Sequence, residues 1–265
     1  MVEKETLMPA RHQRIIELVS ESGYASIEEM ARKFDVTPQT VRRDINSLSE
    51  QGLLKRIHGG AGLVSSVRNI TYQTRKTLFS KEKTIIAEFA VDFIPDNASM
   101  FINIGTTTEA VARALASKRK GIKVITNNLN VASMLGVNSD FEIIIAGGMV
   151  RSKDLGITGE ATVEFIRQFK VDYGIIGVSG IDQDGSLLDF DYNEVRVAKT
   201  IIKNSRKTFL ITDSSKFGRN AMVRLGHLSD IDAIFTDSNP PKEFRKAIRE
   251  AGVELHIAKN SRMNQ

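Results

Sequence analysis

The sequence predicts an α/β protein in two parts: a small N-terminal unit of helices with a hairpin, then an open, mostly parallel sheet flanked by helices. Two observations predict it. Up to about residue 59 the apolar side chains recur at helical spacing, whereas the remainder alternates short apolar runs with helical segments. In addition, 265 residues exceed one typical domain of about 150 residues, so two domains are expected.

Composition excludes several classes of protein. With 41% apolar and 26% charged residues the chain lies in the globular range, which excludes disorder for its bulk. The absence of cysteine excludes disulfides, thiolate catalysis and Cys-based metal sites. No apolar run approaches the roughly 18 residues of a membrane span, and residues 1–10 lack the apolar centre of a signal peptide. We therefore expect a soluble, cytoplasmic protein with no membrane partner.

Charge and histidine spacing bear on the partners. The net charge of +5 allows nucleic acid without requiring it. The four histidines show no metal-ligand spacing, so no metal is expected; they are His12, His58, His227 and His256. We also expect no cofactor.

The N-terminal unit begins with two predicted helices. Residues 11–22 carry an apolar stripe at helical spacing, and Gly23 supplies a stop. Ser26, followed three residues later by Glu29, is typical of a helix start, and this second helix runs to about Phe34.

A third helix and a hairpin complete this unit. Thr37 and Pro38 predict a helix start and Gly52 its end, which gives a helix over 38–50. Its inward stripe is Val41, Ile45 and Leu48. Two short strands, over 53–57 and 61–64, flank the glycine turn at 58–60. Residues 1–64 therefore read as a winged helix-turn-helix.

In such a unit the second helix of the motif enters the DNA major groove, where arginine can read guanine and glutamine adenine. Between residues 51 and 81 there is no acidic residue, which suits a wing that contacts phosphates. Arg42 and Arg43 also fit a merely solvated surface helix. The caps, the spacing and the acid-free wing together favour DNA binding by Thr37, Gln39, Thr40, Arg42, Arg43, Lys55 and Arg56.

The second domain is predicted over 81–258, after a linker at 65–80 and before a tail at 259–265. Apolar runs that predict strands recur at 100–104, 124–126, 143–145, 173–178, 208–212 and 233–236. Predicted helices lie at 82–93, 109–116, 131–135, 161–169, 192–204 and 242–251. This alternation favours a mostly parallel sheet, in which ligands bind beyond the carboxyl ends of the strands.

One strand end suits an anion. Gly105, Thr106 and Thr107 join a strand to a helix start, where backbone N–H groups, hydroxyls and the helix dipole favour a phosphate. An ordinary glycine turn with a threonine N-cap is the alternative. The segment is neither a Walker loop nor a dinucleotide fingerprint.

Other strand ends carry further candidate ligand residues. Asn127 and Asn128 follow one strand and Gly147 and Gly148 the next, although the asparagines also fit simple turns. Later segments add two acids and a base: Asp182, Glu194 and Lys216. Acids in a first helical turn and bases on a surface also occur without any ligand.

The chain resembles the DeoR-type bacterial repressors over nearly its whole length. The resemblance rests on residues 37–45 (TPQTVRRDI) and 55–61 (KRIHGGA), and on GTT at 105–107, TNN at 126–128, AGG at 146–148, GID at 180–182 and DSSKFGR at 213–219. It implies a DNA-binding domain followed by a domain for a sugar-phosphate effector and for oligomerisation, similar in fold to ribose-phosphate isomerases and CoA-transferase-like proteins.

The resemblance also implies roles for single residues. DNA reading falls to Gln39, Thr40, Arg42 and Arg43. Effector binding falls to Gly105, Thr106, Thr107, Asn128, Gly147, Gly148, Asp182, Glu194 and Lys216, and Asn127 is added as a candidate because it follows the same strand as Asn128. Residues 125–132 and 187–192 are most similar to family members that control glycerol catabolism, which implies glycerol 3-phosphate or a similar phosphorylated polyol as effector.

Two functions follow. The first is a repressor, a homodimer or homotetramer, that leaves double-stranded operator DNA when a small phosphorylated polyol or another sugar phosphate binds. The second is a sugar-phosphate isomerase fused to a DNA-binding module, with Asp182 or Glu194 as base and Lys216 holding charge. Isomerisation has no use for a winged helix-turn-helix, so we expect a repressor without catalytic residues.

Overall fold

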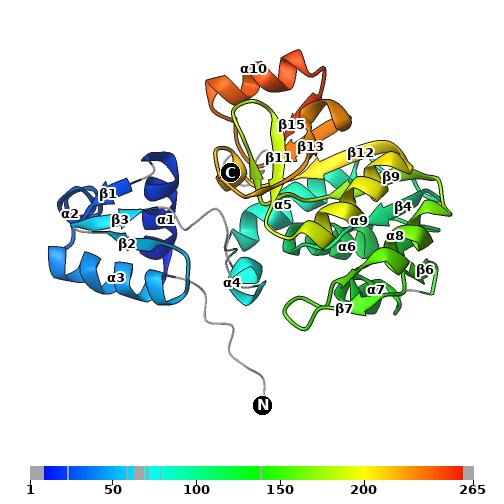
Figure 1. Ribbon diagram of the computed structural model, residues 1–265, viewed down its shortest axis with the longest axis horizontal. Coiled ribbons are helices and arrows are strands. Elements are labelled where there is room, and N and C mark those ends of the chain that lie inside the picture. Colours follow the sequence, from blue (N-terminus) through cyan, green and yellow to red (C-terminus); the bar gives the residue numbers. More distant parts are fainter. Residues whose placement is uncertain are drawn as a thin grey trace. The chain divides into compact units, whose positions relative to one another are not determined.

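A computed structural model describes residues 9–22, 24–57, 59–62, 69, 72–77, 79–137 and 139–258. The chain divides into two compact units, residues 1–79 and 80–265 (Figure 1). The predicted tail at 259–265 lies outside the described residues, as do 65–68, 70, 71 and 78 of the predicted linker. The predicted domain boundaries stay a prediction.

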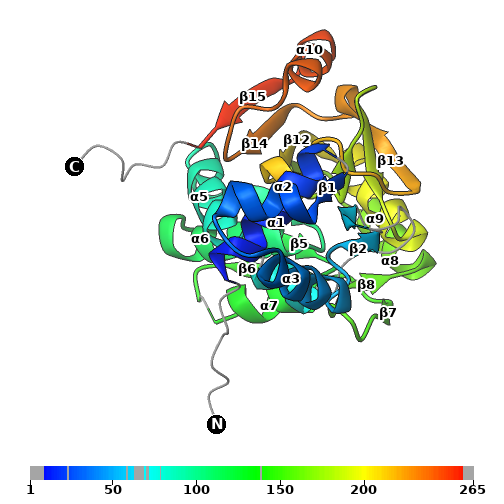
Figure 2. The ribbon, with the colours of Figure 1, turned by 90° about the vertical axis from the view of Figure 1, so that its left-hand side faces the viewer.

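The N-terminal unit contains the three predicted helices, α1 (Ala10–Ser22), α2 (Ile27–Phe34) and α3 (Pro38–Glu50) (Figure 2). Its sheet has the order β1-β3-β2 and is antiparallel, with β1 (Tyr24–Ser26), β2 (Lys55–Ile57) and β3 (Gly60–Gly62). The strand β1 was not predicted, because three residues are too few to show a period. His58, Leu63 and Val64 of the predicted hairpin lie outside the described residues. A short helix, α4 (Tyr72–Thr77), lies within the predicted linker.

Local chemistry explains these helices. Ser26 Oγ accepts a hydrogen bond from Glu29 N, and Thr37 Oγ1 accepts one from Thr40 N, so both helix starts are capped by side chains. The three helices share one core with the sheet, whose buried members include Ile15, Val19, Met30, Val41 and Leu48.

The second unit is built on a seven-stranded parallel sheet of order β15-β14-β12-β9-β4-β5-β6. Its strands are β4 (Ser99–Ile102), β5 (Lys123–Thr126), β6 (Glu142–Ile145), β9 (Val171–Ile176), β12 (Ser205–Ile211), β14 (Ala233–Thr236) and β15 (Glu254–Ile257). The prediction of an open parallel sheet is confirmed. The edge strand β15 was not predicted, because Glu254 and His256 interrupt its apolar pattern.

Helices cover both faces of this sheet. One face packs against α5 (Ser80–Val91), α6 (Thr106–Lys118) and α7 (Leu129–Leu135), and the other against α8 (Glu160–Arg167), α9 (Tyr192–Lys203) and α10 (Lys242–Glu250). Because side chains alternate along a strand, Met100 and Ile102 belong to the first core and Phe101 to the second. Figures 1 and 2 both show α10 beside the β15 edge.

Smaller elements lie between the main strands and helices of this unit. An antiparallel sheet of order β10-β11-β13 contains β10 (Gly180–Ile181), β11 (Ser186–Asp189) and β13 (Val223–His227). The hairpin β7 (Met149–Val150) and β8 (Ile157–Thr158) follows β6. Two short 3-10 turns, η1 (Ser214–Lys216) and η2 (Leu228–Asp230), complete the unit. None of these was predicted as a strand or helix.

The strand order locates a crevice. From β4 the chain continues outward to β5 and β6 on one side, whereas from β9 it continues to β12, β14 and β15 on the other. The order therefore switches between the neighbours β4 and β9. In open parallel sheets, ligands bind at such a point beyond the carboxyl ends of the strands.

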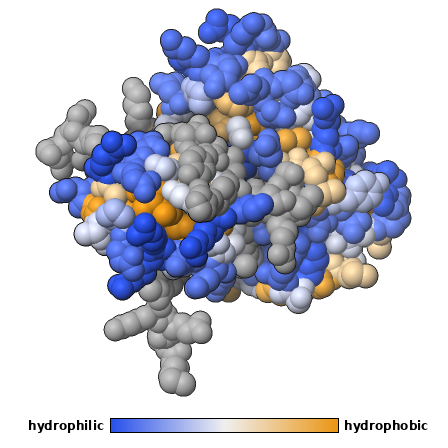
Figure 3. All heavy atoms as spheres, turned by 60° about the vertical axis from the view of Figure 1, so that its left-hand side comes forward, coloured by the Kyte–Doolittle hydropathy of each residue, from blue (hydrophilic) through white to orange (hydrophobic). Residues whose placement is uncertain are grey.

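Within the described residues, no helix is both long and apolar enough to span a membrane. The same residues contain no cluster of three or more His, Asp or Glu side chains suited to a metal ion. On the face drawn in Figure 3, hydrophilic side chains predominate and hydrophobic ones gather in separate patches.

Candidate functional site

The outward face of α3 is polar and solvent-accessible. Gln39, Arg42 and Arg43 are exposed, whereas Thr40 is half-buried. Thr37 Oγ1 lies 3.2 Å from Thr40 N and 2.9 Å from Thr40 Oγ1, so these two threonines hold the helix start together. The structure thus leaves Gln39 and the two arginines in positions from which they can reach a macromolecule.

A groove of about 660 Å³ separates α3 from the wing. Arg42 and Arg56 line it together with Glu28 and Asn46. Arg56 Nη1 donates a hydrogen bond to Asn46 Oδ1 at 3.3 Å, which joins the wing to α3, and Lys55 is exposed on the same strand as Arg56. Two cations in one groove beside a helix suit the phosphate backbone of DNA.

A buried carboxylate fixes α3 against α1. Asp44 accepts hydrogen bonds from Arg11 Nε at 2.5 Å and Arg11 Nη2 at 3.1 Å, and its Oδ1 lies 3.1 Å from His12 Nε2. Burial alone would raise the pKa of Asp44, but the hydrogen bonds and charges of Arg11 and His12 lower it. Asp44 was not predicted to have a role, although an acid beside Val41 and Ile45 on the inward stripe of the helix marks it in the sequence.

The turn after β4 has the features expected of an anion site. Gly105 adopts a φ of 152°, which favours glycine, and no side chain caps α6. Thr106 and Thr107 already lie inside the helix, so the alternative of a threonine N-cap does not hold. Thr108 Oγ1 contacts the carbonyls of Asn103 and Gly105 at 2.7 and 2.8 Å. The first-turn N–H groups of α6 thus lack a side-chain cap, as an anion-binding helix start requires.

The two asparagines after β5 are fully buried and connect neighbouring elements. Asn128 caps α7 through Asn130 N at 2.9 Å and donates to Glu109 Oε1 at 3.1 Å. Asn130 Nδ2 donates to the same oxygen at 3.0 Å, and Asn127 Nδ2 donates to the Ile157 carbonyl at 3.0 Å. They therefore do more than form a turn: they tie β5 to α6 and β8.

Within the described part of this edge, three buried acceptor oxygens lack a hydrogen-bond partner: Asn103 Oδ1, Asn127 Oδ1 and Asp213 Oδ2. They follow β4, β5 and β12 at the carboxyl edge of the sheet. Burial alone would raise the pKa of Asp213, but the charges of Lys216 and Lys83 and the hydrogen bonds from Ser215 lower it. Because buried acceptors are normally paired, these oxygens suit a ligand that brings hydroxyl donors.

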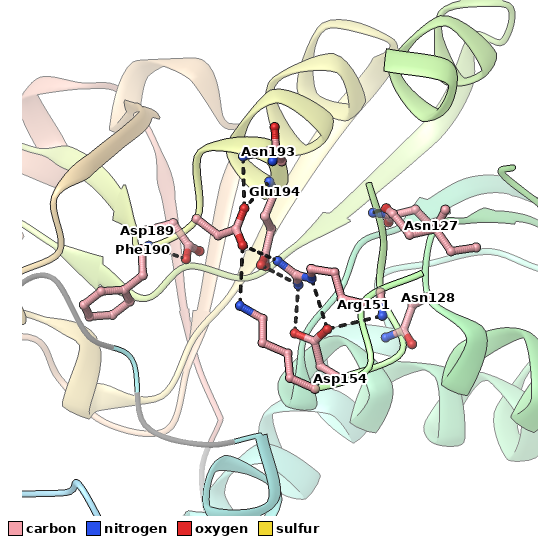
Figure 4. Close-up of polar contacts among 12 residues, drawn as sticks. Asn127, Asn128, Arg151, Asp154, Asp189, Phe190, Asn193 and Glu194 are labelled. Carbon is pink, nitrogen blue, oxygen red and sulfur yellow. Dashed lines mark hydrogen bonds and ion pairs between the residues drawn. The ribbon is translucent and has the colours of Figure 1, made fainter. Parts of the chain in front are cut away.

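A half-buried arginine joins two further elements at this edge. Arg151 donates from Nη2 to Asp154 at 2.7 Å and to Glu194 at 2.8 Å, and from Nη1 to Asp191 at 2.9 Å. Figure 4 shows its guanidinium between Asp154 on one side and the first turn of α9 on the other. With Lys153, which lies 3.4 Å from Asp191, these residues form what we call the Arg151 cluster. Burial alone would lower the pKa of Arg151, but the charges of Glu194 and Asp154 raise it.

The glycine pair after β6 has a packing role. Thr162 Oγ1 of α8 donates to the Gly147 carbonyl at 2.9 Å. A Cβ on Gly148, whose φ is 150°, would lie 2.2 Å from that hydroxyl, so glycine permits the close approach of α8. Their predicted contact with a ligand stays a prediction.

Asp182 and Lys216 lie in neighbouring turns. Asp182 is exposed in the β10–β11 turn, and its N–H donates to the Ser186 carbonyl at 2.9 Å. A bridge between Ile181 and Phe217 brings that turn beside η1, which carries the half-buried Lys216. The structure thus groups Asp182 with Lys216, and Glu194 with Arg151. Arg151, Asn103 and Asp213 were not predicted as site residues.

Each of the two units matches a known protein domain. A model of the DeoR-like helix-turn-helix domain matches residues 11–67, and one of the DeoR C-terminal sensor domain matches residues 79–238. The chain belongs to the DeoR family. A "Glycerol-3-phosphate regulon repressor" of Escherichia coli is 51% identical over 247 residues, 93% of this chain and 98% of that protein. Its namesake of Haemophilus influenzae is 54% identical over 230 residues, 87% and 89% of the two chains.

Among solved structures, a ribose 5-phosphate isomerase from Plasmodium falciparum is similar with a TM-score of 0.38 and 18% identity, covering 51% of this chain and 52% of that one. As a DeoR family member the chain is a DNA-binding transcriptional regulator and not an enzyme. The isomerase alternative, with Asp182 or Glu194 as base, is therefore set aside.

Proposed function

We propose that this DeoR protein represses a glycerol-3-phosphate regulon and leaves its operator when glycerol 3-phosphate occupies the sensor unit. The names of its relatives in two bacteria support the regulon, because the identity extends over most of both chains. The effector itself is inferred from the chemistry of the site.

The phosphate is assigned to the start of α6. There the uncapped N–H groups after Gly105 and the positive end of the helix dipole favour an oxyanion. Thr106 and Thr107 lie in that first turn, as the predicted site requires.

The hydroxyl groups of the polyol are assigned to the three buried oxygens that lack a hydrogen-bond donor. Asn103, Asn127 and Asp213 each present a buried oxygen without a donor, and hydroxyl groups of a polyol are donors of the right kind. This is the observation that carries the proposal, because leaving such oxygens unpaired costs about 1–3 kcal/mol each. A ligand with hydroxyls beside a phosphate satisfies both parts of the site.

On the DNA side, one α3 helix reads a half-site through Gln39, Arg42 and Arg43, while Lys55 and Arg56 contact phosphates. Two-fold pairing of subunits, as homodimer or homotetramer, then places two such helices on successive half-sites. A coupling of about 1–3 kcal/mol between the sites is enough for regulation, and linkage requires DNA to weaken effector binding equally.

The experiment is a titration of labelled operator DNA with protein, with and without glycerol 3-phosphate. We expect the effector to raise the apparent Kd for operator and to raise the melting temperature of the DNA-free protein, since ligands stabilise the state that binds them. Glycerol is the matched control without phosphate. A response only to another three- to six-carbon sugar phosphate would replace the effector and keep the repressor. No DNA binding at all would overturn the proposal.

A further inference from the structure

The Arg151 cluster lies beside the assigned phosphate site. A Cβ built on Gly156 would lie 3.2 Å from Arg151 Nη2 and 2.5 Å from Cδ1 of Ile104, the residue before Gly105. Gly156 is also bridged to Asn128. Gly156 thus lies between the Arg151 guanidinium and the side chain of Ile104, the residue that leads into the turn before α6, and the absence of a side chain at Gly156 lets these two groups approach.

The cluster as the structure describes it carries more negative than positive charge. Two cations, Arg151 and Lys153, contact three carboxylates: Asp154, Asp191 and Glu194. A phosphate dianion arriving beside these carboxylates is repelled unless it takes over a cation, and Arg151 is the less exposed of the two, with 12% of its side chain exposed. A guanidinium binds phosphate in the same two-pronged geometry as carboxylate.

The partners of Arg151 belong to different elements. Asp154 lies with it in the β7–β8 hairpin, only three residues away, whereas Asp191 and Glu194 lie 40 and 43 residues away at the start of α9. Exchanging Asp191 and Glu194 for a phosphate would therefore separate the hairpin from α9 and leave the hairpin's own pair with Asp154 intact. A change of partner at Arg151 would thus alter the contact between the β7–β8 hairpin and α9.

We propose that Arg151 is an effector-phosphate ligand that is held by Asp191 and Glu194 in the effector-free protein and is transferred to the phosphate when the effector binds. This rests on the proposed function and deepens it, because it says how occupancy alters the contacts of the sensor unit and predicts that the polyol must carry a phosphate. The bound effector and the α9 carboxylates compete for one guanidinium.

Three full-length variants test the exchange with glycerol 3-phosphate as the probe, measured by titration calorimetry. Arg151→Gln should weaken binding about tenfold or more, since it removes a charge-assisted contact. Asp191→Asn should tighten it about threefold or more, because a competitor is lost while asparagine still caps α9, where Asp191 Oδ1 accepts from Asn193 N and Glu194 N. Lys199→Gln is the control, because Lys199 is an exposed lysine of α9 outside the Arg151 cluster, and we expect a change below about twofold, since exposed charges are screened.

The opposite shifts of Arg151→Gln and Asp191→Asn distinguish exchange from a merely structural ion pair, whose loss would move both variants the same way. If Arg151→Gln does not fold, the contrast between Asp191→Asn and Lys199→Gln decides. Unchanged binding in Arg151→Gln, or weaker binding in Asp191→Asn, overturns the inference and leaves the proposed function standing. A wild-type protein that binds neither glycerol 3-phosphate nor inorganic phosphate overturns both.

Discussion

The guanidinium of Arg11 donates two hydrogen bonds to the carboxylate of Asp44, at 2.5 and 3.1 Å, and so holds α3 against α1. Replacing Asp44 by asparagine removes the charge from this pair and should destabilise the N-terminal unit by about 1–3 kcal/mol. Hydrogen exchange of the α3 amides measures this loss. Asp35→Asn is the matched control, because Asp35 is exposed, has a φ of 53°, and asparagine accepts that conformation well. Equal protection in both variants would contradict the prediction.

The same carboxylate predicts how stability depends on pH. The folded-state pKa of Asp44 lies below its value of about 3.9 in the unfolded chain, because Arg11 and His12 favour the charged form. Its contribution to stability is therefore complete above that unfolded value and is lost as pH falls through the lowered folded value. Protection of α3 in the wild type should decline as pH falls below about 4, and Asp44→Asn should decline less. Parallel curves for the two proteins would rule out this role of Asp44.

We expect α3 to recognise the bases of the operator and the wing to contact its phosphates. Arg43→Ala removes an exposed side chain of α3 and should cost about 1–3 kcal/mol of operator binding while relaxing base preference. Lys55→Ala removes a wing charge and should weaken all sequences alike, with the salt slope lower by about one. Binding to operator and to random DNA at several salt concentrations measures both effects. Similar losses on the two DNAs for both variants would refute the division.

Much of the fold was predictable because its signals are local. Thr37 and Pro38 predict the start of the helix at 38–50, and the structure has this helix there as α3. The buried parallel strands are continuous apolar runs, so six of the seven were predicted near their observed positions. The strands β1 and β15 were not predicted. β1 has only three residues, and β15 lies at the edge of its sheet, where apolar residues alternate with polar ones. Their pairing comes from tertiary contacts that no window of sequence contains.

The site was predictable where a backbone turn marks it and not where distant side chains meet. The turn at Gly105 was predictable from the sequence, because the backbone conformation that it requires favours glycine. Arg151 has no such mark: its position beside Glu194 depends on how the β7–β8 hairpin and α9 pack, and they are 43 residues apart in the chain. Asn103 and Asp213 likewise become notable only once burial shows that their oxygens lack donors.

The turn at Gly105 gives a test of the phosphate site that does not involve Arg151. Gly105→Ala places a Cβ 3.3 Å from Thr108 Oγ1 at a φ of 152°, which should strain the turn by about 1–3 kcal/mol and misdirect the first N–H groups of α6. We expect glycerol 3-phosphate to bind about tenfold more weakly by calorimetry, with operator binding retained. Gly177→Ala is the control: Gly177 follows β9 at the same edge, and its Cβ would meet its nearest neighbours at an ordinary 3.9 Å. Should Gly105→Ala bind the effector as tightly as Gly177→Ala does, the phosphate does not lie at the start of α6.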